Sequence, residues 1–276
     1  MLQIVDGQAA ATAVANPPSS PGSEAPTRRE GLVPMLVVVA GLIAAIQIAS
    51  FYLPSFVMPT PLAIFKATAE ILQTDYIHIG VTALRLVIAI LFATAFGVLL
   101  GVVMGIFPKA CPYVRALVTI DTGIPALSWM LLAVFWFGAP EVRIFFILSV
   151  ILVPFYALSI FDGIRALPSD WVDMVESFRP QRWQVLRYLI LPHIVPSVLT
   201  TSKSVVGYAI RMVVFSELVA STVGIGSRMS LAQSMFRIDS VLGWTVILIV
   251  LNFILQRALT VLEKQLLKWR VEANVR

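Results

Sequence analysis

The sequence is poor in the residues that build most catalytic and metal sites. Among its 276 residues there is one cysteine, Cys111, and there are two histidines, His78 and His193. A single cysteine excludes an intrachain disulfide, and two distant histidines without neighbouring ligands disfavour a metal centre. The pattern G-x-x-x-x-G-K-[ST] is also missing, so we expect no ATP to bind this chain through a P-loop.

Charged residues are scarce as well. They make up 13% of the chain, whereas hydrophobic residues make up 59% and the mean hydropathy is +0.91. A soluble domain is about 25% charged and about 45–50% apolar. The composition therefore indicates a membrane protein. The net charge of +5 comes from dispersed Lys and Arg residues rather than from one basic domain, which argues against nucleic-acid binding.

Long apolar stretches take the place of charge. A bilayer core of about 30 Å needs about 20 apolar residues in a helix. The third stretch contains Asp121, Gly123 and Pro125, so we expect its helix to be kinked or broken near its start. The six predicted spans are roughly 32–53, 83–107, 116–137, 144–163, 193–220 and 241–262.

The remaining segments suggest how the chain is organised. Residues 1–30 are rich in Pro, Ser, Gly and Ala without periodicity, which predicts a disordered cytoplasmic tail. Residues 31–270 form the predicted transmembrane domain, and 271–276 a short C-terminal tail. The first apolar stretch is longer and begins later than the core of a signal peptide, so we expect it to be retained. Between the first two spans, a helix beginning near Pro61 is expected at the outer surface.

Lys and Arg residues predict the orientation of the chain. If the first segment is cytoplasmic, the inner segments carry 13 of these residues and the outer segments carry 4. Cytoplasmic loops of membrane proteins are enriched in Lys and Arg. Both termini and the loop 164–191 are therefore predicted on the cytoplasmic side.

That loop contains "WVDMVESFRPQRWQVLRYLILP", a charged insert between apolar stretches. Pro168 and Ser169 open a first short helix, which Pro180 should end, and a second begins near Gln181. One interpretation is an amphipathic segment that lies on anionic lipid. The other is a docking element, because an exposed helix with aromatic and arginine side chains suits a groove on a partner.

The insert resembles the coupling loop of permeases from ATP-binding-cassette (ABC) importers, which has the pattern E-A-A-x3-G-x9-I-x-L-P. Asp173-Met174-Val175, three residues, Arg179, nine residues and Leu189-Ile190-Leu191-Pro192 keep this spacing. The segments "MPTPLAIFKA", "IPALSWMLLAVFWFG", "STVGIGS" and "LEKQLLKWR" are similar to the nitrate/sulfonate/taurine subfamily of these permeases. The likeness covers about residues 32–270.

The resemblance implies an all-α membrane protein with the type I ABC importer permease fold, about six transmembrane helices and a cytoplasmic coupling loop. It implies a multi-pass protein of the inner membrane that transports a small anionic solute of the sulfonate, taurine or nitrate type. The expected ATPase-docking residues are Asp173, Met174, Val175, Glu176, Ser177, Phe178, Arg179, Pro180, Gln181, Arg182 and Trp183.

The same resemblance implies a set of partners. Two copies of a cytoplasmic ABC ATPase bind and hydrolyse the ATP, so this chain is expected to be neither an enzyme nor the carrier of a cofactor. A second permease chain, identical in a homodimer or different in a heterodimer, completes the path within membrane lipid. An extracytoplasmic solute-binding protein delivers the solute.

The loop also departs from the family pattern. Asp173 replaces Glu, Met174 and Val175 replace two alanines, and Arg179 replaces a glycine. Glycine permits a left-handed turn, whereas an arginine before Pro180 favours an extended one. The loop could therefore need a dedicated ATPase or a more regular second permease. The alternative function is a stand-alone secondary transporter or channel that has lost ATPase coupling.

Polar residues within the spans are candidates for the translocation path, because charges at membrane depth usually face a cavity or a partner. Lys203 and Arg211 are eight residues apart and share a helix face, which would suit an anionic solute. The other interpretation is that Lys203 reaches toward the membrane surface and Arg211 forms an ion pair with Asp121 or Glu217. The full candidate set is Asp121, Lys203, Arg211, Ser216 and Glu217.

Small residues recur every four positions in the second span, at Gly97, Gly101 and Gly105. Such ladders allow helices to approach closely. They predict packing within the subunit or, as the alternative, a dimer interface.

Overall fold

The computed structural model describes residues 28–55 and 57–268, and every regular element in these residues is helical. Helix α1 (Arg28–Tyr52) crosses the boundary between two compact units, Met1–Ala45 and Ile46–Arg276. The predicted tails, 1–30 and 271–276, lie outside the described residues except for 28–30, which begin α1.

The second unit holds the remaining helices, and their order along the chain is simple. They are α2 (Pro61–Thr74), α3 (Tyr76–Ile106), α4 (Cys111–Gly123), α5 (Ala126–Trp136), α6 (Pro140–Arg165), α7 (Ser169–Ser177), α8 (Arg182–Val185), the π-helix η1 (Leu186–Ile190), α9 (Leu191–Ala220), α10 (Ile225–Ser234) and α11 (Ile238–Leu266).

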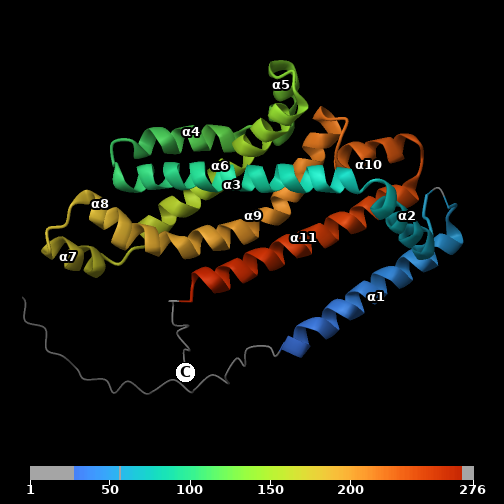
Figure 1. Cartoon of the computed structure of the whole chain (residues 1–276), viewed down its shortest axis with the longest axis horizontal. Helices are drawn as coiled ribbons and strands as arrows, with labels where there is room; N and C mark the ends of the chain where they lie inside the picture. The colour runs from blue at the N-terminus through green and yellow to red at the C-terminus, as the bar shows by residue number, and fades with distance from the viewer. Residues whose placement is uncertain (1–27, 56, 269–276) are drawn as a thin grey trace, which may run out of the picture. The chain divides into compact units, whose positions relative to one another are not determined.

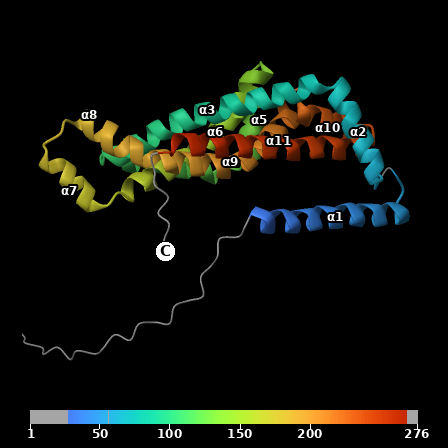
Figure 2. The same ribbon diagram turned by 60° about the horizontal axis from the view of Figure 1, so that its bottom comes forward.

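In this unit α3, α6, α9 and α11 run as a bundle of long helices (Figures 1 and 2). Helices α7 and α8 lie at one end of the bundle, and α2 and α10 lie at the other. The segment predicted to dock an ATPase and the segment predicted at the outer surface are therefore separated by the length of the bundle.

Four of the six predicted spans correspond to single long helices, a fifth to a bent pair, and the first, 32–53, to a helix whose apolar part is shorter. Among the described residues four helical segments are long and apolar enough to cross a bilayer, namely 76–106, 140–165, 183–220 and 238–266. Helices α4 and α5 are together long and apolar enough to form one more span, with a bend of 94° between them. Pro125, whose ring removes a backbone N–H and disfavours helical continuation, lies at this bend as the N-cap of α5, so the predicted break in the third span is confirmed. The apolar part of α1, Leu36–Tyr52, is shorter.

The glycine ladder packs α3 against α6. A Cβ atom on Gly101 would lie 2.7 Å from Ile160 Cβ and 2.8 Å from the Ala157 carbonyl oxygen. One on Gly105 would lie 2.7 Å from Ile164 Cδ1. The ladder therefore serves packing within the subunit, as the first of the two interpretations predicted.

Helix α2 begins where the sequence predicted. The side chain of Thr60 caps it by accepting a hydrogen bond from the Ala63 backbone N–H at 3.2 Å. Its buried face carries Ile64, Ala67 and Ile71, and Ile71 packs with Trp244 of α11. The opposite apolar positions are exposed in the isolated chain: Leu62, Phe65 and Leu72.

Candidate functional site

The insert folds into two short helices with exposed apolar side chains. Helix α7 ends at Ser177, and α8 begins at Arg182. Among the residues around the turn, Met174 and Trp183 are exposed and Phe178 is 81% exposed. Large apolar groups in water are costly unless a partner or a membrane covers them. The pair of helices thus has the properties of a docking element.

The turn between these helices is left-handed, and the extended turn predicted for Arg179 is wrong. Arg179 has a φ of 47°. On one side, the Phe178 N–H closes α7 by donating to the Val175 carbonyl oxygen at 3.2 Å. On the other, the side chain of Gln184 accepts from the Gln181 N–H at 2.8 Å. These bonds constrain the backbone on both sides of Arg179, which adopts the conformation that glycine would provide.

The loop is joined firmly to the bundle. Leu186 and Ile190 of η1 pack with Ile160, Ile164 and Ile194, which belong to α6 and α9. Residues 183–220 continue from α8 through η1 into α9 as one spanning segment. A displacement of α7 and α8 would therefore act on α6 and α9.

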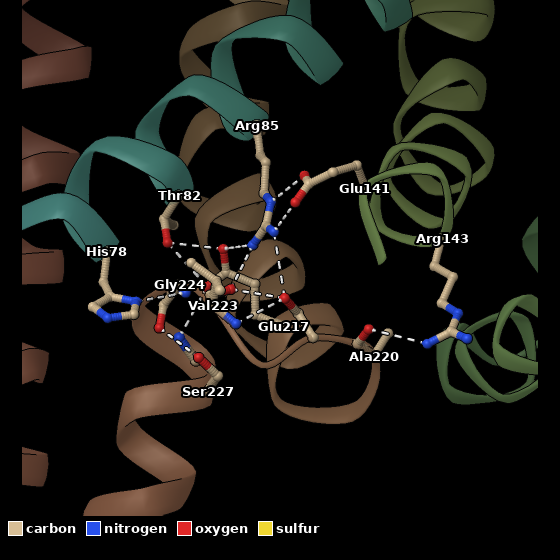
Figure 3. A network of polar contacts seen from close by, with 12 residues as sticks. His78, Thr82, Arg85, Glu141, Arg143, Glu217, Ala220, Val223, Gly224 and Ser227 are labelled. Atoms are coloured by element: carbon tan, nitrogen blue, oxygen red, sulfur yellow. Dashed lines mark hydrogen bonds and ion pairs between the residues drawn. The ribbon is translucent and has the colours of Figure 1, made fainter. Parts of the chain in front are cut away.

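An ion network with a buried centre lies toward the opposite end, where α3, α6 and α9 meet (Figure 3). Glu217 of α9 is fully buried. Arg85 of α3 donates from Nη1 to Glu217 Oε1 at 2.8 Å and to the Val223 carbonyl oxygen at 2.7 Å. Its Nε donates to Glu141 Oε2 of α6 at 2.7 Å. One guanidinium thus joins three helices.

The second half of the network positions the segment after α9. Thr82 donates from Oγ1 to Glu217 Oε1 at 2.8 Å and accepts from the Ile225 N–H at 2.9 Å. The Gly226 N–H donates to Glu217 Oε2 at 2.9 Å. Gly224 has a φ of 121°, which only glycine adopts without strain. The carboxylate of Glu217 is therefore satisfied in the bundle core and anchors the start of α10.

Sequence reasoning identified one member of this network and missed the others. Glu217 was expected to face a path or to pair with Arg211, whereas it pairs with Arg85. The available signal was Arg85 itself, a charge inside the second apolar stretch. Its partners, Glu141 and Thr82, gave no local pattern that pointed to a common site.

The other predicted path residues lie apart from one another. Lys203 forms an ion pair with Glu263 of α11, and Ser216 is buried and donates to the Met212 carbonyl oxygen at 2.7 Å. Arg211 is exposed on α9 and forms neither a hydrogen bond nor an ion pair within the part of the chain that the structure describes. Asp121 lies near the end of α4, beside the bend.

Among the described residues no three His, Cys, Asp or Glu side chains are placed to hold a metal ion. The geometry shows a loop with exposed apolar side chains at one end, a fixed polar core toward the other, and charged side chains on the helices between them. These features define the chain as a helical membrane protein with an exposed apolar loop at one end of its bundle.

Comparison with known proteins identifies the family. Residues 93–268 match the model of the binding-protein-dependent transport system inner membrane component, and the chain belongs to this family. It is therefore a permease subunit of the ABC transporter class, and the stand-alone alternative is not favoured.

Relatives cover nearly the whole chain. The taurine transport system permease protein TauC of Escherichia coli (strain K12) is 27% identical over 252 residues, which are 88% of this chain and 90% of TauC. The putative aliphatic sulfonates transport permease protein SsuC of Bacillus subtilis (strain 168) is 25% identical over 248 residues, 88% of this chain and 90% of SsuC.

Solved structures share the fold. An inward-facing structure of the MetNI methionine ABC transporter superposes with a TM-score of 0.63 at 15% sequence identity, over 71% of this chain and 98% of that chain. An amino acid ABC transporter with histidines superposes with a TM-score of 0.56 at 16% identity, over 71% of this chain and 97% of that chain. At this identity the likeness concerns the fold alone.

Proposed function

We propose that this permease subunit forms the path for a small anionic solute of the sulfonate type in an ATP-driven importer. The observation that carries the proposal is the loop of α7 and α8. It exposes Met174, Phe178 and Trp183 while continuing through η1 into the spanning helix α9. A partner that grips this loop can move α9, and such rigid-body displacement is a common way of switching between two packings.

The partner that suits this loop is a cytoplasmic ATPase, present in two copies, which binds and hydrolyses the ATP. A second permease chain would cover the apolar faces of the bundle that remain exposed in the isolated chain. An extracytoplasmic binding protein would deliver the solute at the end of the bundle where α2 and α10 lie. In this arrangement both termini and the α7–α8 loop lie in the cytoplasm, as the excess of Lys and Arg in those segments favours.

The anionic character of the solute rests on Arg211 and on two relatives. Relatives named for taurine and aliphatic sulfonates make an acidic solute the first choice. Arg211 is exposed on a spanning helix without an intrachain partner among the described residues, and an unpaired charge at membrane depth is costly unless it faces a polar path or a partner. Arg211→Met should abolish uptake or redirect it toward other solutes, and unchanged uptake would remove Arg211 from the path.

Co-purification tests the coupling proposal. The tagged chain is expressed in its native source, extracted in mild detergent, and the proteins that accompany it are identified. We expect an ABC ATPase with the wild type and its loss when Phe178, Arg179 and Trp183 are all changed to Ala. The matched control is Phe236→Ala, which removes an aromatic side chain that is 75% exposed at the opposite end of the bundle. It should leave the ATPase bound.

Two outcomes would contradict this proposal. An ATPase retained by the triple variant would place docking elsewhere on the chain. If no ATPase accompanied either form, the stand-alone transporter would become the better account.

A further inference from the structure

Two arginine side chains from different helices meet on one buried aromatic ring. Arg115, near the start of α4, lies over the ring of Phe161 of α6, with its Cζ atom 6.0 Å from the ring centroid. Arg165, in the last turn of α6, has its Cζ atom 5.6 Å from the same centroid. Phe161 itself is buried against Met104 of α3 and Val118 of α4. Because a guanidinium is attracted to the face of an aromatic ring, Phe161 holds both positive charges at one place.

No acidic side chain neutralises this pair. Both arginines are exposed, and neither forms a hydrogen bond or an ion pair within the part of the chain that the structure describes. The same is true of Lys109, which lies two residues before Cys111, a member of the cluster around Phe161. Asp162, three residues before Arg165, is exposed and forms no ion pair with either arginine. Lys109, Arg115 and Arg165 thus form a basic corner with an excess of positive charge.

The basic corner lies at the end of the bundle that carries the α7–α8 loop. Arg165 ends α6, and α7 begins shortly afterwards at Ser169. Figure 1 shows the connection between α3 and α4 at this same end. It is the proposed cytoplasmic end, where the membrane surface is negative. Lys and Arg side chains at the ends of spanning helices extend to the level of the lipid headgroups, so the basic corner is expected to lie beside lipid phosphates.

An apolar cavity continues from the basic corner between α3, α4, α5 and α6. Its volume is about 520 Å³. Val118 belongs both to its wall and to the cluster around Phe161, so the cavity begins beside the ring that carries the arginines. Apart from Asp121 and Ser149, the wall consists of apolar and aromatic side chains, and one of them, Leu117, is 63% exposed. Such a wall suits a hydrocarbon chain and disfavours a polar solute.

We propose that the basic corner and this cavity together bind one anionic phospholipid, with its phosphate at Arg115 and Arg165 and an acyl chain in the cavity. Guanidinium groups bind phosphate through charge-assisted hydrogen bonds, and basic pockets between spanning helices on the cytoplasmic side are recurring sites for anionic lipid headgroups. The lipid would join α4 to α6 just before the chain enters the α7–α8 loop. The inference rests on the proposed function only for the side of the membrane that this end faces.

Brominated lipids test the site without relying on transport. Bromine atoms on an acyl chain quench nearby tryptophan fluorescence, and Trp129 and Trp136 line the cavity. The purified full-length chain, together with any ATPase that accompanies it, is reconstituted into bilayers of phosphatidylglycerol and phosphatidylcholine. One of the two lipids carries dibrominated chains, and the label is then exchanged. Comparison of the two arrangements gives the preference of the cavity for the anionic lipid.

We expect phosphatidylglycerol to be preferred by the wild type. Arg115→Gln combined with Arg165→Gln should reduce the preference about tenfold, because each basic residue near an anionic surface contributes up to about fivefold. The matched control is Arg257→Gln combined with Lys264→Gln, which removes the same charge from exposed positions of α11 and should leave the preference unchanged. Replacing both cavity tryptophans by Phe should abolish the part of the quenching that depends on the headgroup.

Three results would overturn the inference. The first is a preference that the arginine variant keeps or that the α11 control loses equally, since neither would place the lipid at the basic corner. The second is loss of the preference with inorganic phosphate but not with sodium chloride at equal ionic strength, which would indicate a site for the free anion. The third is the absence of any preference while Ile120→Cys, at the 65% exposed cavity wall in a Cys111→Ser background, forms disulfide-linked dimers. That result would assign the cavity to a second copy of the chain.

Failure of this inference can be distinguished from failure of the proposed function. ATP-driven uptake by the reconstituted importer and co-purification of the ATPase are measured separately. Either would still support the proposed function if the lipid preference were absent.

Discussion

At the scale of single residues, Arg85 is the side chain on which the polar core depends. It is 9% exposed and donates hydrogen bonds to Glu141, Glu217 and the carbonyl oxygen of Val223. Glu217 is fully buried, so its charge is tolerable only while the guanidinium and the hydrogen-bond donors around it are in place. The network therefore holds α3, α6, α9 and the segment leading to α10 in one arrangement.

Replacing Arg85 should destabilise the fold strongly. Arg85→Met leaves a buried carboxylate without its cation, and we expect a loss of about 3–5 kcal/mol in unfolding free energy. Thermal unfolding of the purified chain in detergent measures the effect. The double variant Arg85→Met with Glu217→Gln removes the orphaned charge and should regain part of the stability. If the double variant were less stable than the single one, the charge of Glu217 would not be the cause.

Arg179 offers a second prediction at this scale. Its φ of 47° is strained for a residue with a Cβ atom, at a cost of about 1–2 kcal/mol. Arg179→Gly should relieve this strain and slow proteolytic cleavage of the loop between α7 and α8. Arg179→Ala removes the same charge but keeps the Cβ atom, so it should leave the cleavage rate near that of the wild type. Equal protection by both variants would assign the effect to charge.

At the scale of elements, the close contact between α3 and α6 depends on glycines of α3, which carry no side chain. The backbone of α3 at Gly101 lies close to Ile160 and Ala157, which brings the two helices within reach of one another. Gly80 belongs to the same helix, but a Cβ atom added to it would meet no atom within 4 Å. Substitutions at these two glycines therefore distinguish the effect of helix packing from the effect of helix propensity.

Alanine substitution at these glycines should have opposite effects. Gly101→Ala forces α3 and α6 apart, and we expect a loss of about 1–3 kcal/mol. Gly80→Ala should be neutral or slightly stabilising, because alanine is the better helix former. Thermal unfolding of both variants in the same detergent provides the comparison. A neutral Gly101→Ala would mean that the helices can separate without loss.

At the scale of the complete bundle, the α7–α8 loop and helix α10 lie at opposite ends (Figure 1). In a membrane they should face opposite sides. In the Cys111→Ser background, a cysteine at Ser234 should react with an impermeant maleimide on intact cells. One at Ser177 should react only after permeabilisation. The reverse pattern would invert the proposed orientation, and reaction of both on intact cells would contradict the separation of the two ends.

How much the sequence could predict depended on the distance between the residues involved. The apolar stretches, the break at Pro125, the start of α2 at Pro61 and the two short helices of the loop were all predictable, because each depends on neighbouring residues and on the length of a bilayer-spanning helix. The helical membrane class followed from these elements, whereas the type I permease fold was implied by the resemblance to ABC importer permeases.

The polar core was not predictable, because its members are far apart in the chain. Arg85 and Glu217 are separated by 132 positions, and nothing local indicates that they meet. The same holds for the face of α2 that packs on α11 and for the two arginines that meet on Phe161. Even the left-handed turn at Arg179 overrides its local preference, since bonds on both sides fix the backbone. The helices and the class of protein thus follow from short stretches of sequence, whereas the pairing of charges emerges only in the folded bundle, because it depends on how the helices pack.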